Sequence, residues 1–144
     1  MKSKVLVGIQ FGMILLMLLP LGTEMIYPGL GAFFIVLGLT VGGAALLKNR
    51  LGNFNIVPDI KDDCTLIKDG VYAYIRHPMY TSVITTMFGV LLLYWNVYFM
   101  PYAYGILVIN MLVKMFYEES LWKCHSGEYL EYTKNTSRLI PKVF

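Results

Sequence analysis

The chain has 144 residues, of which 57% are hydrophobic and 15% charged, and its formal net charge is +3. This composition is too apolar for an ordinary soluble domain of this length and predicts a single membrane domain. The basic residues are spread along the chain and balanced by acids, which gives nucleic-acid binding no support. The two cysteines, Cys64 and Cys124, form neither a CxxC motif nor a disulfide framework.

Two apolar runs open the chain. The first, Val5 to Leu21, follows a basic start as a signal peptide would, but no small-residue cleavage site follows it, so a retained membrane helix is favoured. The second, Pro28 to Leu47, carries Gly38 and Gly42 at the GxxxG spacing that lets membrane helices approach closely. Packing against another helix of the same chain is favoured there over a dimer face.

Residues 48–77 interrupt this pattern with a charged aqueous connector, of a length that usually accompanies function or disorder. A third helix is predicted from about Pro78 to Tyr94 and a fourth from about Val97 to Tyr117. The tight turn at Trp95–Asn96 makes these two helices antiparallel neighbours.

Beyond the fourth helix the sequence turns polar. It predicts a short amphipathic helix to about Ser126, a break at Gly127, a second short helix and an extended tail. All 12 Lys and Arg residues fall at the N-terminus, in the connector, or from Lys114 onward. The positive-inside rule therefore places both termini and the connector in the cytoplasm.

The predicted fold is an all-α integral membrane bundle of about four transmembrane helices. Residues 1–47 are expected to form an N-terminal helix pair, and residues 48–144 complete the same domain. A cytoplasmic ligand pocket is expected between the connector, the third and fourth helices and the C-terminal segment.

Arg76, His77 and Pro78 stand immediately before the third apolar run. Pro78 suits the first position of a helix and restricts His77 to extended geometry. The end of such a helix is positively polarised and attracts a carboxylate or a phosphate. The N–H groups expected to be free belong to Met79, Tyr80 and Thr81. A helix that simply begins at the membrane surface explains the same residues without a ligand.

A second group of polar residues lies near the cytoplasmic end of the fourth helix. Lys114 and Glu118 are four residues apart and share a helix face. If the last two helices are antiparallel, His77 and Glu118 lie at the same depth, beside aromatic rings that suit a sulfonium or ammonium group. Glu119 points about 100° away around the helix, and a solvated face is the alternative for both glutamates. The histidines, cysteines and carboxylates lack metal-ligand spacing, which disfavours a metal site.

Several motifs of the chain stand in the order and spacing of a known family. The motifs are LG at 51–52, TLIKDGVYAYIRHPMY at 65–80, EESL at 118–121, GEYLEY at 127–132 and RLIP at 138–141. With these motifs the chain resembles the isoprenylcysteine carboxyl methyltransferase family and the related phospholipid methyltransferases, which are small integral membrane enzymes. The resemblance covers roughly residues 48–144 and implies that they form a methyltransferase-like catalytic region whose cytoplasmic pocket binds the cofactor.

The resemblance implies S-adenosylmethionine as methyl donor, S-adenosylhomocysteine as product, and cofactor binding at the cytoplasmic face. Lys114 stands where the family commonly has an arginine that meets the substrate carboxylate; lysine keeps the charge but loses the bidentate fork. Lys114 and Arg76 are the candidate catalytic residues. The implied cofactor contacts are the backbones of Thr65, Leu66 and Ile67, together with Tyr72, His77, Pro78, Met79, Tyr80 and Glu118.

The methyl acceptor is expected to be lipophilic: a prenylated thiol-acid, a lipid amine or a small apolar metabolite. Membrane lipids are the other expected partners. Two alternatives stay open. Sterol-reductase-type membrane enzymes use NADPH and a similar RHPxY segment, but they continue into Gly-Glu, whereas Thr81–Ser82 follow here. A non-enzymatic membrane scaffold is the other alternative.

Overall fold

The computed structural model describes residues 2–19, 25–49, 65–94, 98–125 and 127–144. Over these ranges the regular secondary structure is helical, apart from one isolated parallel bridge between Ile75 and Ser137, which confirms the all-α prediction. The elements are α1 (Lys2–Leu18), α2 (Pro28–Lys48), the 3-10 turn η1 (Gly70–Ala73), α3 (Pro78–Leu93), α4 (Met100–His125) and α5 (Gly127–Asn135). Half of the predicted connector, residues 50–64 with Cys64 and the LG motif, and the turn at Trp95–Asn96 lie outside the described residues.

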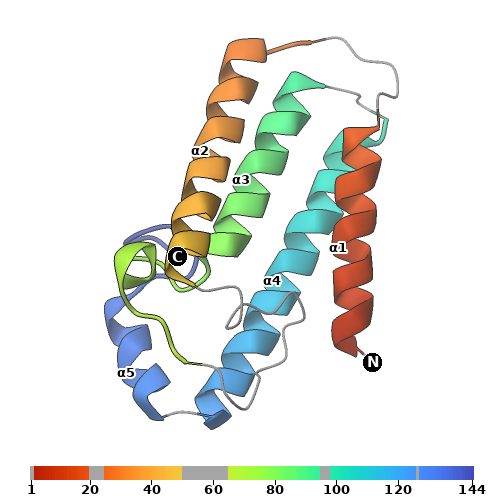
Figure 1. Ribbon diagram of the computed structural model, residues 1–144. Coiled ribbons are helices and arrows are strands. Elements are labelled where there is room, and N and C mark those ends of the chain that lie inside the picture. The colour runs from red at the N-terminus through yellow and green to blue at the C-terminus, as the bar shows by residue number, and fades with distance from the viewer. Residues whose placement is uncertain (1, 20–24, 50–64, 95–97, 126) are drawn as a thin grey trace.

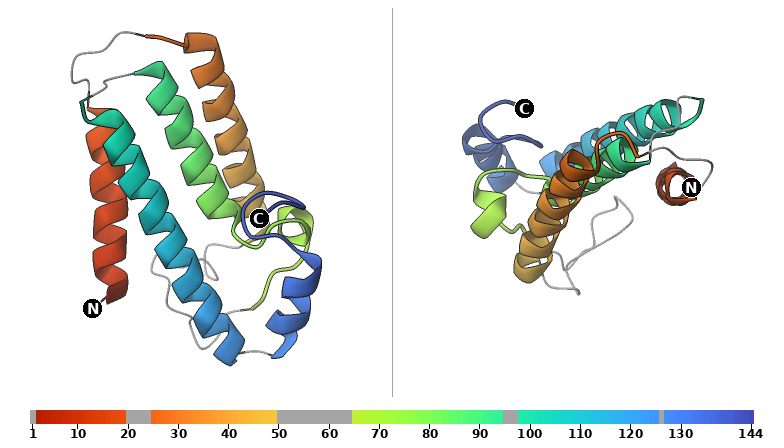
Figure 2. Two further views of the ribbon diagram at one scale, coloured as in Figure 1. Left: turned by 180° about the vertical axis from the view of Figure 1, so that it is seen from behind. Right: turned by 90° about the horizontal axis from the view of Figure 1, so that it is seen from above.

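Helices α1 to α4 form a bundle whose members run alternately up and down (Figure 1). Figure 2 shows the same arrangement from behind and from above, with α2 and α3 side by side and α1 against α4. Helix α5, η1 and the C-terminal residues gather at the end of the bundle where α2 ends and α3 begins. This arrangement brings segments that are far apart in the sequence to the start of α3.

The lengths and surfaces of these helices suit a lipid environment. Helix α2 and residues Met100–Cys124 of α4 are long and apolar enough to cross a membrane, and α1 and α3 contribute shorter apolar helices. The 21 residues of α2 correspond to about 32 Å, close to the ~30 Å hydrocarbon core. Large apolar side chains such as Phe33 (59% exposed) and Leu47 (87% exposed) face outward. The fold is therefore an all-α membrane bundle.

Glycines bring α2 and α3 into close contact. A Cβ added to Gly38 would lie 2.6 Å from the backbone nitrogen of Thr86, and one added to Gly89 would lie 2.6 Å from the carbonyl oxygen of Gly31. The Ser82 hydroxyl on α3 donates a 2.7 Å hydrogen bond to the carbonyl oxygen of Gly38. The prediction that the GxxxG spacing serves packing within the chain is confirmed.

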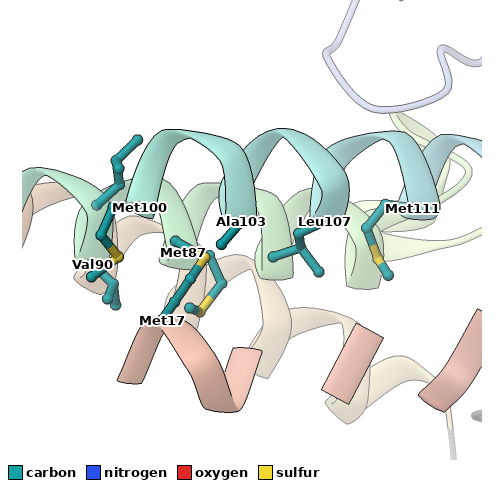
Figure 3. Close-up of a cluster of buried hydrophobic side chains, with 8 residues drawn as sticks. Met17, Met87, Val90, Met100, Ala103, Leu107 and Met111 are labelled. Atoms are coloured by element: carbon teal, nitrogen blue, oxygen red, sulfur yellow. The ribbon is translucent and has the colours of Figure 1, made fainter. Parts of the chain in front are cut away.

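Between α1, α3 and α4 the core is filled by flexible side chains rather than by glycines. Figure 3 shows Met17 of α1, Met87 and Val90 of α3, and Met100 of α4 converging on one cluster. Methionine adapts to irregular gaps because its unbranched side chain has three rotatable bonds. Two chemically different interfaces therefore hold α3 in place.

The predicted helix boundaries are correct for α2 and for α3, which ends one residue before the expected Tyr94. The prediction of a separate helix after Tyr117 is wrong, because α4 continues without a break to His125. The sequence from Glu118 to His125 contains neither glycine nor proline, so nothing ends the helix. The prediction of a second short helix is confirmed, but this helix, α5, starts at Gly127 itself, where a break was expected.

Candidate functional site

The start of α3 is ordered by the residue before its proline. His77 caps the helix and Pro78 occupies its first turn. The carbonyl oxygen of His77 accepts 3.0 Å hydrogen bonds from the backbone N–H groups of both Tyr80 and Thr81. The expectation that these two N–H groups are free for an anion is therefore wrong.

Side chains from α3 and α4 meet at this helix start. The Tyr80 hydroxyl donates a 2.6 Å hydrogen bond to Oε2 of Glu118. The His77 imidazole, which is buried, stacks on the Tyr80 ring with centroids 5.3 Å apart and an 8° angle between the planes. His77 Nδ1 lies 3.9 Å from the same carboxylate oxygen. The prediction that His77 and Glu118 lie at the same depth is confirmed, and we call these three residues the aromatic–carboxylate group.

Lys114 lies one turn further along α4 from Glu118, towards the middle of the bundle. The residue is 1% exposed, and its Nζ lies 5.5 Å from the centroid of the Tyr80 ring. The ammonium donates a 2.5 Å hydrogen bond to the amide oxygen of Gln10 on α1. The sequence pointed to Glu118 or a substrate carboxylate as its partner and did not anticipate Gln10.

Glu119 is buried, although the sequence offered a solvated helix face as the alternative for both glutamates. Its side chain is 3% exposed and accepts 3.2 Å hydrogen bonds from Nε of Arg76 and from Nε of Arg138. His77 Nε2 lies 3.5 Å from Oε1 of the same carboxylate. We call these four residues the buried ion cluster. Because Glu119 turns away from the aromatic–carboxylate group, α4 uses its two adjacent glutamates on two different faces.

The C-terminal residues complete the start of α3 through backbone hydrogen bonds. The N–H groups of Arg76 and His77 donate to the carbonyl oxygens of Ser137 (2.8 Å) and Arg138 (3.0 Å). Thr81 Oγ1 donates to the carbonyl oxygen of Leu139 at 2.9 Å. The first turn of α3 is thus held by a segment about sixty residues later in the chain.

Arg76 adds a side-chain connection to the same segment. Its Nη1 donates to the backbone oxygens of Thr133, at 3.2 Å, and of Thr136. The Arg138 guanidinium lies over the rings of Phe116 and Phe144, at 5.4 Å from each centroid. Both arginines therefore join α4 to the C-terminal segment.

Tyrosines on α5 pack beneath this arrangement. The Tyr132 hydroxyl donates a 2.6 Å hydrogen bond to the carbonyl oxygen of Tyr72 in η1, and Tyr129 stacks on Trp122 of α4. Burial raises the pKa of the Tyr72, Tyr129 and Tyr132 hydroxyls, so all three are neutral at physiological pH. The hydroxyls of this layer therefore carry no charge.

Of the predicted site residues, the structure brings His77, Tyr80, Lys114 and Glu118 together, and Arg76 stands behind them in the buried ion cluster. Pro78 is buried and Met79 half-buried in the first turn of α3, and Tyr72 is buried in η1. Thr65, Leu66 and Ile67 form the start of the described segment that leads to η1. Among the described residues no three His, Cys, Asp or Glu side chains are grouped so that they could hold a metal ion.

A comparison with protein families now identifies the chain. A family model described as phospholipid methyltransferase matches residues 27–125. The chain belongs to the phospholipid methyltransferase family. Among curated proteins, none matches the chain. Membership of this family, together with the apolar helices of the bundle, makes the chain a membrane methyltransferase.

The family match covers only part of the arrangement described above. It runs from α2 to the end of α4 and so includes the whole aromatic–carboxylate group. Gln10 lies before the match, and Arg138 lies after it. In the sequence, the one signal for Gln10 is that it is a single polar residue within an apolar run, and Arg138 stands out only as part of a terminal motif.

Proposed function

We propose that this membrane methyltransferase takes its methyl group from S-adenosylmethionine and transfers it to a lipophilic acceptor, as isoprenylcysteine carboxyl methyltransferases do. Family membership supports the methyl transfer. The observation that supports the cofactor is the aromatic–carboxylate group, in which Tyr80 donates to Glu118 and stacks on His77. Aromatic faces beside a carboxylate suit a ligand that carries a sulfonium and an ammonium group.

The residues present fit such a cofactor. The Glu118 side chain is 29% exposed, so its carboxylate is accessible to a ligand as well as to Tyr80. Within the part of the chain that the structure describes, the buried hydroxyl of Tyr129 has no hydrogen-bond partner. Buried polar atoms of this kind often mark a place where a further partner binds.

When bound, the cofactor would supply a methyl group that its sulfonium already activates. We propose that the Glu118 carboxylate binds the ammonium group of the cofactor. The rings of His77 and Tyr80 would contact its apolar part and its sulfonium. The remaining contacts are proposed to come from the backbones and side chains named by the family motif: Thr65, Leu66, Ile67, Tyr72, Pro78 and Met79. The protein then has to position the acceptor and exclude water.

Lys114 and Arg76 are proposed to serve the reaction in different ways. Lys114 lies beside Tyr80 on the bundle side, where an acceptor buried in lipid would arrive, and its ammonium suits a carboxylate. Arg76 is held by Glu119 and by the C-terminal backbone. We therefore propose that Arg76 serves catalysis indirectly, by positioning the adjacent His77.

The cofactor is tested by titrating the purified protein with S-adenosylhomocysteine and, separately, with NADPH in a calorimeter. Binding of S-adenosylhomocysteine alone is the expected result. Binding of NADPH alone would replace the proposal with the reductase alternative, and binding of neither would favour the scaffold alternative. We further propose that residues 48–144 form the catalytic region of this domain; in the fold, α2 packs on α3 and α1 on α4.

The acceptor is tested by methyl transfer to a farnesylated cysteine and to an amino-lipid, in the wild type and in Lys114→Met. For a carboxylate acceptor, Lys114→Met should raise the apparent KM of the acceptor by about one to two decades and leave S-adenosylhomocysteine affinity nearly unchanged. The family description favours an amino-lipid as the second candidate, and for a cationic amine the variant should be harmless or helpful. Wild-type transfer to the amine with none to the acid would decide for that second candidate.

The proposed location of the site is the cytoplasmic side of the membrane. The distribution of Lys and Arg residues supports this location. They occur at the end of the bundle that carries the site and not in the turns at the opposite end. A cysteine introduced at Asp69 should react with an impermeant reagent only after permeabilisation of cells. Labelling of this cysteine in intact cells would show that the site lies on the opposite side of the membrane.

A further inference from the structure

Gln10 is the polar exception in an apolar helix. Between Val5 and Leu18, every other residue of α1 is apolar or glycine. A side-chain amide that faces lipid without a partner is costly, and Gln10 instead points inward and is 9% exposed. Its oxygen accepts the 2.5 Å hydrogen bond from Nζ of Lys114.

This contact connects α1 to the proposed acceptor side of the site. Lys114 Nζ lies over the Tyr80 ring, and the Tyr80 hydroxyl is bonded to Glu118. An unbroken series of contacts therefore runs from Gln10 through Lys114 and Tyr80 to Glu118, the residue proposed to bind the cofactor. Gln10 is the only member of this series that lies outside the family match.

The chemistry of an amide suits the task of holding a cation without neutralising it. An ammonium has three donors, and an amide oxygen satisfies one of them while leaving the positive charge in place. A glutamate at the same position would form an ion pair and compete with any anionic headgroup. Because Lys114 is almost fully buried, an acceptor reaches it only when surrounding side chains move, and an ammonium that is already fixed reduces the cost of binding.

We propose that Gln10 is a positioning residue that holds the Lys114 ammonium for an anionic acceptor headgroup, so that α1 forms part of the acceptor site. This inference rests on the carboxylate acceptor proposed above. It assigns the N-terminal helix a role in choosing the acceptor, beyond that of a membrane anchor.

A second polar contact between the same two helices provides a matched control. The Asn110 side chain, one turn from Lys114 on α4, donates a 3.0 Å hydrogen bond to the carbonyl oxygen of Leu6 on α1, and Asn110 is 5% exposed. Asn110 joins α1 to α4 as Gln10 does, but its hydrogen bond goes to the backbone of α1 and not to Lys114. A purely structural role for Gln10 would make the two positions behave alike.

The experiment measures binding of a farnesylated cysteine, its methylation, and binding of S-adenosylhomocysteine, all with the full chain in lipid nanodiscs. Gln10→Met, which keeps the side-chain length, should weaken farnesylated-cysteine binding and raise its KM about tenfold, the loss expected for one hydrogen bond to a charged group. The value of kcat and the S-adenosylhomocysteine affinity should stay within about twofold. Gln10→Glu should weaken acceptor binding further, and Asn110→Leu should change only thermal stability.

A double-mutant cycle gives the decisive result: in the Lys114→Met background, Gln10→Met should have no further effect on the acceptor. Equal changes in acceptor affinity for Gln10→Met and Asn110→Leu, or additive effects with Lys114→Met, would overturn the inference. If the wild type binds S-adenosylhomocysteine but no farnesylated cysteine, the inference fails with the carboxylate acceptor while the proposed cofactor stands. If it binds neither compound, the proposed function fails as well.

Discussion

Helix α3 is held by two interfaces that differ in kind. Along its length it packs on α2 through glycines, with backbone close to backbone. At its first turn it meets α4 and the C-terminal segment through a carboxylate, two guanidinium groups and an imidazole. The glycine interface depends on shape and excludes any added atom. The charged interface depends on counter-ions, so removing one charged group leaves its buried partners without a counter-charge.

The largest effect is expected from Glu119→Gln, which removes the only carboxylate that we find in the buried ion cluster of the described chain. Arg76 and Arg138 would then lack a counter-charge, and removing one partner of a buried ion pair typically costs about 3–5 kcal/mol. Unfolding in detergent micelles measures this loss. Glu128→Gln is the control, because Glu128 pairs with Lys68 at the surface and exposed pairs contribute less than about 1 kcal/mol.

The position of Glu119, about 100° around the helix from Glu118, did not predict this loss of stability. Equal, small losses of stability for Glu119→Gln and Glu128→Gln would show that the cluster does not hold the start of α3. Increased proteolysis after residue 127 in Glu119→Gln would show directly that the C-terminal segment had been released.

An intermediate effect is expected from Glu118→Gln, and on ligand binding rather than on folding. Losing one charged hydrogen bond to the cofactor should cost roughly 1.5–3 kcal/mol, or about one to two decades in S-adenosylhomocysteine affinity. Calorimetric titration gives the affinity, and the unfolding midpoint should remain close to that of the wild type. Unchanged affinity would remove Glu118 from the proposed cofactor site.

The smallest effect is expected at the glycine interface, from Gly38→Ala. The new methyl group would meet backbone atoms of Thr86 and Ser82 on α3, and overpacking of this kind costs about 1–3 kcal/mol. Gly43→Ala on the same helix is the matched control, because nothing lies within 4 Å of its added Cβ. The difference between the two unfolding free energies measures the interface, and equal values would contradict the close packing of α2 on α3.

Features that depend on neighbouring residues in the sequence were predicted well. Pro28 and Pro78 mark the starts of α2 and α3, and the spacing of Gly38 and Gly42 identified a face that packs within the chain. The contact between His77 and Glu118 followed from an antiparallel helix pair. Local propensity, small-residue spacing and a short turn suffice for these features.

Features that depend on distant partners were not predictable in the same way. Glu119 is buried only because Arg76 and Arg138 reach it from two other segments. Gln10 accepts its hydrogen bond from Lys114, which is 104 residues away in the sequence. In a single sequence neither pairing leaves a periodic pattern, so the burial of Glu119 and the partner of Lys114 required the structure.

The backbone contacts between residues 76–81 and residues 137–139 have a consequence for the biogenesis of the protein. Synthesis proceeds from the N-terminus, so α3 leaves the ribosome well before the C-terminal segment that holds its first turn. Insertion of α1 to α4 into the membrane can therefore precede completion of the site. A nascent protein that stalled after α4 would have all four helices inserted but would lack the C-terminal contacts that organise His77.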